Sequence, residues 1–116
     1  MTVVNLTPHP ITLRTAAGDE TIPSSGVARC TPAPAVATDE GLPVPVARPG
    51  GPMGPVVGLP SPAPGAVYIV SAMVLAHPDC AGRKDVLAPG TGPADGAIRD
   101  GAGHIVAVTR LVGVAL

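Results

Sequence analysis

Apolar residues occur in short runs that alternate with polar residues, and prolines or glycines separate most of the runs. Alternation with a period of two predicts short strands that each place one face on a core. The expected strands are Val3–Leu6, Ile11–Arg14, Glu20–Pro23, Val27–Cys30, Ala66–Val70, Ala97–Arg99 and His104–Arg110, the last extended by residues 112–116. Turns at Ala16–Asp19 and Asp100–Gly103 predict two hairpins.

One short helix is expected at about residues 71–77, directly after the strongest predicted strand. Ser71 is a suitable N-cap, and Pro78 cannot continue a helix. A nucleophilic role for Ser71 is disfavoured, because the glycines that flank a nucleophile elbow are missing. Residues 79–92 are expected to form a loop.

Prolines and glycines concentrate in the middle of the chain, where each proline removes a backbone hydrogen-bond donor. Residues 31–36 and 47–65 are therefore expected to connect strands within one domain of residues 1–116. Leu42–Val46 and Pro55–Gly58 are expected to be edge strands around a glycine turn. The expected fold is mostly β, a small compact antiparallel barrel or sandwich with one short helix.

Composition narrows the function. The chain has one Tyr, no Phe and no Trp, and its seven Lys and Arg face eight Asp and Glu. Nucleic-acid binding is not expected, because it favours a basic surface and stacking rings. No apolar run is long enough for a membrane span, and no signal peptide is evident. We expect a cytoplasmic protein whose two cysteines, Cys30 and Cys80, are free thiols, with a disulfide between them as the alternative.

The common chemical motifs are absent. His77 and Cys80 form one metal-ligand pair where a structural zinc site needs two, so no metal is expected. The glycine-rich segments Gly50–Gly54 and Gly90–Gly92 lack the lysine of a phosphate loop. Residues 83–92 are either an anion-binding turn or a solvated loop. No catalytic residue and no cofactor are predicted.

A polar set remains as the candidate ligand-binding site. Pro8 and Pro10 hold the segment around His9 extended, which lowers the entropy lost on binding. Arginines suit phosphate, carboxylate or peptide recognition. The alternative is that the threonine and histidine close a turn while Arg–Asp pairs brace loops. The candidate residues are Asn5, Thr7, His9, Arg29, Arg83, Asp85, Arg99 and Arg110.

An ordered string of segments supports a resemblance. The segments are Asn5–His9, Pro23–Arg29, Val56–Pro60, Tyr68–Ser71, Arg83–Val86, Ala88–Gly90, Ile98–Asp100, Ile105–Val108 and Arg110. In this order they resemble a family of proteins of about this size in actinobacteria and other bacteria and in their phages and prophages. The family has no settled activity, so the resemblance implies a phage or prophage setting and no mechanism.

Three functions from different classes follow. The first is a non-enzymatic binding module, a homo-oligomer that sequesters a small phosphorylated or nucleotide-like ligand in the manner of an anti-defence sponge. The second is a protein–protein adaptor or a virion or accessory structural protein, with the proline-rich segments as its contact surface. The third is a small hydrolase that uses His9. The expected partner is thus a small anion or a protein.

Overall fold

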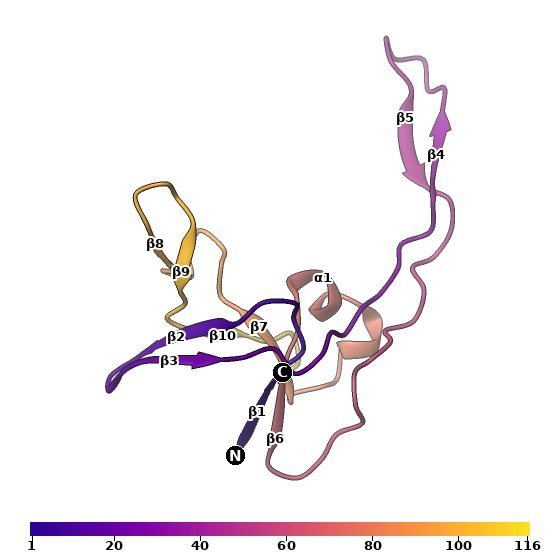
Figure 1. Ribbon diagram of the computed structural model, residues 1–116. Helices are drawn as coiled ribbons and strands as arrows, with labels where there is room; N and C mark the ends of the chain where they lie inside the picture. Colours follow the sequence, from indigo (N-terminus) through magenta and orange to yellow (C-terminus); the bar gives the residue numbers. More distant parts are fainter.

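The computed structural model describes all 116 residues, and a four-stranded sheet forms its centre (Figure 1). The strand order is β1 (Thr2–Asn5), β6 (Ala66–Ile69), β7 (Val86–Pro89) and β10 (Leu111–Val112). β6 is parallel to both β1 and β7, whereas β10 pairs with β7 antiparallel. The sheet is therefore mixed, although every hairpin of the chain is antiparallel as expected.

A short helical crossover joins the parallel strands β6 and β7. It contains α1 (Ala72–Leu75) and the 3₁₀ turn η1 (Pro78–Cys80). Ser71 is the N-cap of α1 as predicted, and its hydroxyl oxygen accepts a hydrogen bond from the Val74 amide at 3.3 Å. The helix ends two residues earlier than expected. No helix of the chain has the length and apolar character needed to cross a membrane.

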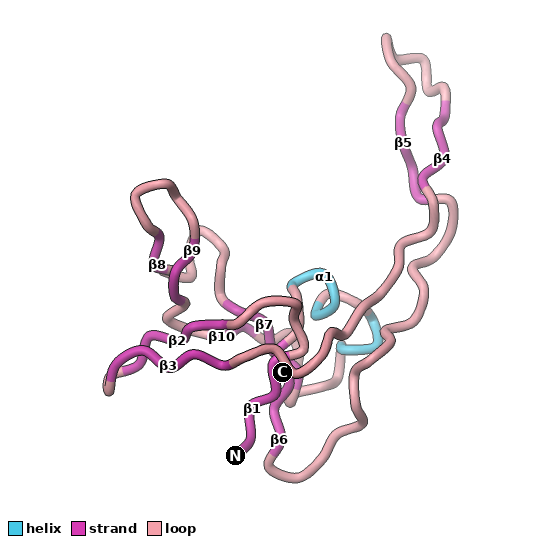
Figure 2. Tube along the Cα trace, in the orientation of Figure 1, coloured by secondary structure: helices cyan, strands magenta, loops and turns pink.

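Three hairpins extend from the central sheet (Figure 2). Two of them were predicted from the turn residues, and the third lies in the proline-rich middle of the chain. They are β2 (Ile11–Thr15) with β3 (Gly18–Ile22), β8 (Ile98–Arg99) with β9 (Ile105–Ala107), and β4 (Ala35–Thr38) with β5 (Val46–Pro49). The mostly β prediction is confirmed, and none of the sheets closes into a barrel.

Both faces of the central sheet are covered, because successive strand residues point to opposite sides. On one face Tyr68 and Val86 pack with Val74 and Leu75 of α1. On the other face Ile69 packs with residues of β2 and with Val108, which directly follows β9. The molecule thus has a helix layer, a sheet and a hairpin layer around two small apolar clusters.

Two expectations about short strands were wrong. Val27–Cys30 forms no strand, because its backbone makes only isolated contacts, a bridge between Arg29 and Val57 and a hydrogen bond from the Ala28 amide to the Leu6 carbonyl. Conversely, β7 lies in the segment expected to be a loop, and its Val86 is fully buried. This strand has only four residues, which directly follow three charged side chains and show no usable periodicity. Pairing with β6 and β10 specifies this strand.

The middle of the chain also differs from its prediction. Leu42–Val46 was expected to be an edge strand, but residues 42–45 lie in the turn between β4 and β5, and only Val46 belongs to a strand. Pro55–Gly58 contributes only the bridge at Val57. Residues 35–38, expected in part to be a connection, pair with β5 from Ala35–Pro49 to Thr38–Val46. We call residues 31–60, which carry this hairpin, the arm.

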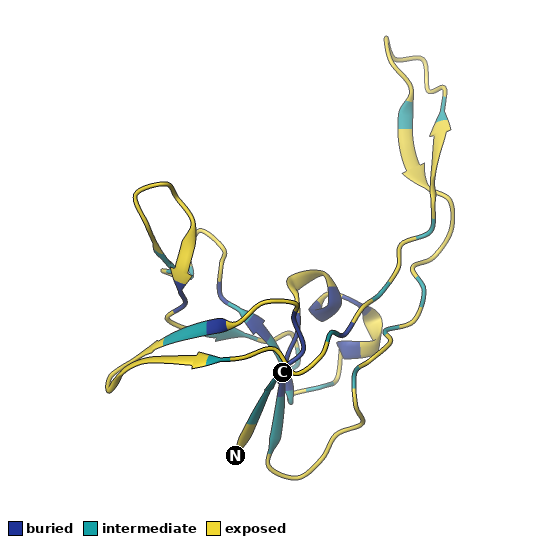
Figure 3. Cartoon of the chain, viewed as in Figure 1, coloured by how far each residue is buried: buried dark blue, intermediate teal, exposed yellow.

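The arm makes the molecule extended (Figure 1). The radius of gyration is 16.9 Å, whereas a compact chain of this length has about 13 Å. No residue from Arg29 to Val67 is buried, and Figure 3 shows the arm exposed almost throughout. The expected compact shape is therefore not observed. Seventeen residues of the chain are buried, and all of them lie outside this segment.

Candidate functional site

Asn5 is the most highly connected of the candidate residues, and its side chain is completely buried. The Asn5 amide nitrogen donates to the backbone oxygens of His9 (2.8 Å) and Ile22 (3.0 Å). The amide oxygen accepts from the Thr7 backbone nitrogen (3.0 Å) and hydroxyl (2.7 Å). An asparagine side chain offers two donors and two acceptor sites. All four are used within the protein.

The turn after β1 is therefore built around Asn5. The Thr7 hydroxyl also contacts the His9 carbonyl at 3.0 Å, and the Ser24 hydroxyl donates to the Thr7 carbonyl at 2.6 Å. These bonds join β1, the proline-stiffened turn and the end of β3. Thr7 thus has the structural role given as the alternative in the sequence analysis, and Asn5 shares it, with no free polar group left for a ligand on Asn5.

The His9 side chain is separate from this network and exposed. It lines a groove between β2 and β9, which we call the β2/β9 groove, with a volume of about 340 Å³. Half of the ten lining residues are hydrophobic, among them Ile11, Val106 and Val108. No serine or cysteine lines this groove. The groove therefore offers His9 no nucleophile for hydrolysis.

Arg83 and Asp85 form a two-pronged ion pair just before β7. The guanidinium donates to both carboxylate oxygens, at 2.9 and 2.7 Å, and to the Pro60 carbonyl at 3.0 Å. Both side chains are about one-fifth exposed, at 19% and 20%. Arg83 holds the pKa of the Asp85 carboxyl below its usual range. The pair ties the end of the arm to the central sheet.

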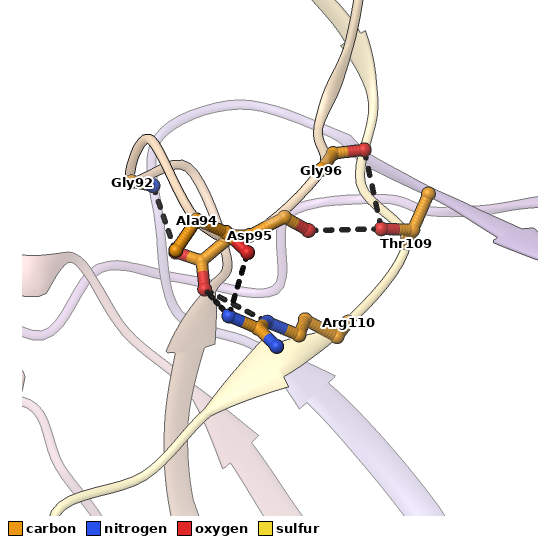
Figure 4. Close-up of polar contacts among 6 residues, drawn as sticks. All are labelled: Gly92, Ala94, Asp95, Gly96, Thr109 and Arg110. Atoms are coloured by element: carbon orange, nitrogen blue, oxygen red, sulfur yellow. Dashed lines mark hydrogen bonds and ion pairs between the residues drawn. The ribbon is translucent and has the colours of Figure 1, made fainter.

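Arg110 is also committed to a carboxylate, and its Nε and Nη2 both donate to one oxygen of Asp95 (Figure 4). The guanidinium nitrogen Nε donates to the carboxylate at 2.8 Å, and Nη2 donates to the Ala94 carbonyl at 2.9 Å. The other carboxylate oxygen accepts from the Gly92 amide at 2.8 Å. Arg110, with the Gly92 amide second, lowers the pKa of Asp95. The anion that this glycine-rich turn binds is thus a carboxylate of the chain itself.

The remaining arginines follow this pattern, with one exception. Arg14 pairs with Asp19 across the β2–β3 hairpin, Arg48 pairs with Glu40 in the arm, and Arg99 donates to the Gly103 carbonyl at 2.9 Å. Arg29 makes no side-chain hydrogen bond. It lines a cavity of about 300 Å³ together with Thr7 and Cys30. The candidate residues therefore do not meet in one pocket, and only Thr7 and Arg29 share one.

The root of the arm holds functional groups that the sequence analysis did not assign. The buried His77 ring contacts the Gly54 carbonyl through Nε2 at 2.9 Å and accepts the Asp79 amide through Nδ1 at 3.0 Å. With Nδ1 as the acceptor, Nε2 is the ring nitrogen that donates to the Gly54 carbonyl. The Asp79 carboxylate accepts from the Val56 amide at 3.1 Å. The His-Pro-Asp sequence at the start of η1 was the available signal.

Gly58 completes this root. Its backbone has a φ of +86°, and a Cβ there would lie 2.6 Å from the Val27 carbonyl oxygen. Only glycine adopts this conformation and this close approach without strain. The neighbouring Val57 and Arg29 exchange backbone hydrogen bonds at 2.7 and 2.8 Å. The arm is thus held at its base although it is unsupported beyond it.

The structure offers few other reactive or metal-binding groups. Cys30 and Cys80 are free thiols, and burial raises the pKa of the Cys80 thiol, which makes it a weak nucleophile. No three His, Cys, Asp or Glu side chains lie close enough together to hold a metal ion. Comparisons with protein-family models, curated proteins and solved structures find no match. The function must therefore be argued from these contacts.

Replacing Asn5 tests the turn network. We expect Asn5→Ala to lower the free energy of unfolding by about 3 kcal/mol or more, because it leaves several buried backbone groups without a partner. Thr12→Ala is the control, since Thr12 bonds only the exposed Thr21 hydroxyl, and we expect less than about 1 kcal/mol. Urea denaturation measures both. Equal losses would contradict the role assigned to Asn5.

Acid should weaken the ion pairs between the arginines and their carboxylate partners. The folded-state pKa values of Asp19, Glu40, Asp85 and Asp95 are all lowered. Their stabilisation is complete above the unfolded-state pKa of about 4 and is lost as the pH falls through the lower folded-state values. We expect thermal stability to fall below about pH 4.

A pair of variants tests whether the ion-paired carboxylates cause this pH dependence. Asp85→Asn should lower the free energy of unfolding by about 1 kcal/mol at neutral pH. It should also make the fall in melting temperature at acid pH less steep. Glu20→Gln, at a carboxylate with no side-chain hydrogen bond or ion pair, should leave the curve unchanged. Melting temperatures recorded across the acid range measure both, and an acid limb unaffected by Asp85→Asn would contradict the assignment.

Proposed function

We propose that this protein is a structural or adaptor component that assembles with further copies of itself through its arm. The observation that carries the proposal is that an ordered hairpin projects from the molecule while no residue from Arg29 to Val67 is buried. A lone two-stranded hairpin in water is only marginally stable. Contact with a partner supplies the missing apolar burial.

The exposed area supports this proposal. The chain has 7333 Å² of solvent-accessible surface, whereas a compact monomer of its mass has about 5,700 Å². The excess is about 1,600 Å², and a stable interface covers about 800 Å² on each partner. Two such contacts per chain would cover the excess. Exposed apolar side chains along the arm, including Val36, Leu42 and Val44, supply the surface that such contacts need.

The state of the arginines argues against the first function expected from the sequence, a module that sequesters an anion. Arg83, Arg99 and Arg110 each donate to groups of the chain itself. A ligand would have to displace these bonds. The phage or prophage setting implied by the resemblance is compatible with an assembling accessory protein. A partner of different sequence is the competing version of the proposal.

Excising the arm tests the proposal. The Gly50 amide donates to the Pro34 carbonyl at 3.1 Å, so a Gly-Gly linker can replace residues 35–49 without moving the root. We expect the intact chain to be an oligomer and the excised chain a monomer. The melting temperature of the excised chain should equal that of the intact chain, because none of the removed residues is buried. Sedimentation velocity and circular dichroism measure both, and an excised chain that still forms the same oligomer would contradict the proposal.

One observation favours a second candidate function, the binding of a small anion at Arg29. This guanidinium has no partner within the chain and lines a cavity with Thr31 and Ser71. Hydroxyls and a free guanidinium suit a phosphate group.

Calorimetric titration with AMP and with pyrophosphate tests this candidate. We expect Arg29→Ala to abolish any binding, whereas Lys84→Ala, at another cation without an ion pair, should preserve it. No heat with either probe on the intact chain would remove this candidate.

A further inference from the structure

The arm ends in an apolar loop, residues 41–46, which we call the arm tip. Leu42 is 59% exposed and Val44 is 68% exposed. Pro43 and Pro45 fix the backbone and remove two donors, so the loop loses little conformational freedom when it docks. A loop of this kind suits an apolar groove.

The arm tip is held in position by polar contacts behind it. Arg48 and Glu40 form a two-pronged ion pair across the hairpin. The Thr38 hydroxyl donates to the Val46 carbonyl at 3.2 Å, and the Asp39 carboxylate accepts from the Gly41 amide at 3.1 Å. These contacts satisfy the polar groups at the base of the loop. The apolar side chains of Leu42 and Val44 are left presented to solvent.

The β2/β9 groove has the complementary character. Its volume of about 340 Å³ lies at the lower end of the roughly 300–1,000 Å³ of binding pockets. Ile11, Val106 and Val108 line it together with Pro10, while His9 and two threonines supply polar groups. Val106 is 47% exposed and belongs to neither apolar cluster of the core. The groove therefore has room and apolar surface for a few side chains.

The arm tip cannot fill the groove of its own chain. In Figure 1 the arm and the β8–β9 hairpin extend to opposite sides of the central sheet, and the molecule is 56 Å long. Any occupant of the groove must come from another molecule. Two contacts per chain require two distinct surfaces, and the arm tip and the β2/β9 groove are such a pair.

We propose that the arm tip of one copy docks in the β2/β9 groove of a second copy. This inference rests on the proposed function, because it names the two surfaces through which the copies associate. The contact is between two different surfaces, so it can propagate head to tail or close reciprocally. In either arrangement each copy offers one tip and accepts one tip. The intact chain thus has two complementary halves of the same contact.

This complementarity permits a mixing test on the full-length chain. Val44→Asp places a charge on the tip, and Val106→Asp places one in the groove. Each variant alone should be monomeric with an unchanged melting temperature, because both sites are exposed. A mixture of the two should form a one-to-one heterodimer, since one variant keeps an intact groove and the other an intact tip. Light scattering after size exclusion measures the masses. Val114→Asp, also at a residue 47% exposed, is the control and should assemble like the parent chain.

Each failure has a distinct meaning. If both variants are monomeric and their mixture stays monomeric as well, the tip and the groove are each needed for assembly but do not bind one another, and the tip-to-groove contact is wrong. If Val106→Asp assembles like the parent chain, the groove is not the docking site, whereas arm-mediated assembly still stands. If the parent chain is monomeric at every concentration, self-assembly and this inference both fail. If either variant is unfolded, Leu42→Ser and Val106→Ser replace the pair, with the same expected masses.

Discussion

Hydrophobic burial along this chain stops at Ala28 and resumes at Tyr68, and this gap governs the shape of the molecule. Without Phe or Trp, the apolar clusters on the two faces of the central sheet are built mainly from small aliphatic side chains. These clusters cannot cover a further hairpin. The intervening residues therefore leave the core and project as an arm. Its base is held by His77, Asp79 and the ion pair of Arg83 with Asp85.

Polar contacts hold the turns that the small apolar core does not reach. Asn5 satisfies four hydrogen bonds at the turn after β1, and Asp95 is held by Arg110 and the Gly92 amide at the turn after β7. Buried and partly buried contacts of this kind stabilise most when every partner is satisfied. No buried side-chain polar atom lacks a partner. This explains why a glycine- and proline-rich chain has defined turns, and why its candidate ligand residues are largely occupied.

The predictability of the fold from sequence differed between its elements. The strand at Ile11 follows from alternation, the strand at Ala66 follows from a short apolar run, and the helix after Ser71 follows from its cap. β7 could not be predicted, because its burial arises from neighbours distant in sequence. The arm hairpin pairs alanines between prolines, where local preference for strand is weak. For the site, the sequence placed Asn5 and Thr7 together among the candidate ligand residues, and in the structure their polar atoms bond one another. Whether their polar atoms face a ligand or one another depends on three-dimensional pairing.

Self-assembly through the arm is the central claim, and hydrogen exchange at residues 35–49 tests it most directly. Amide protection in β4 and β5 should increase with protein concentration, because a second copy covers a hairpin that is only marginally stable alone. Protection in β6 and β7 should be independent of concentration. Exchange in the arm that stays fast at concentrations where the chain is fully oligomeric would contradict the claim.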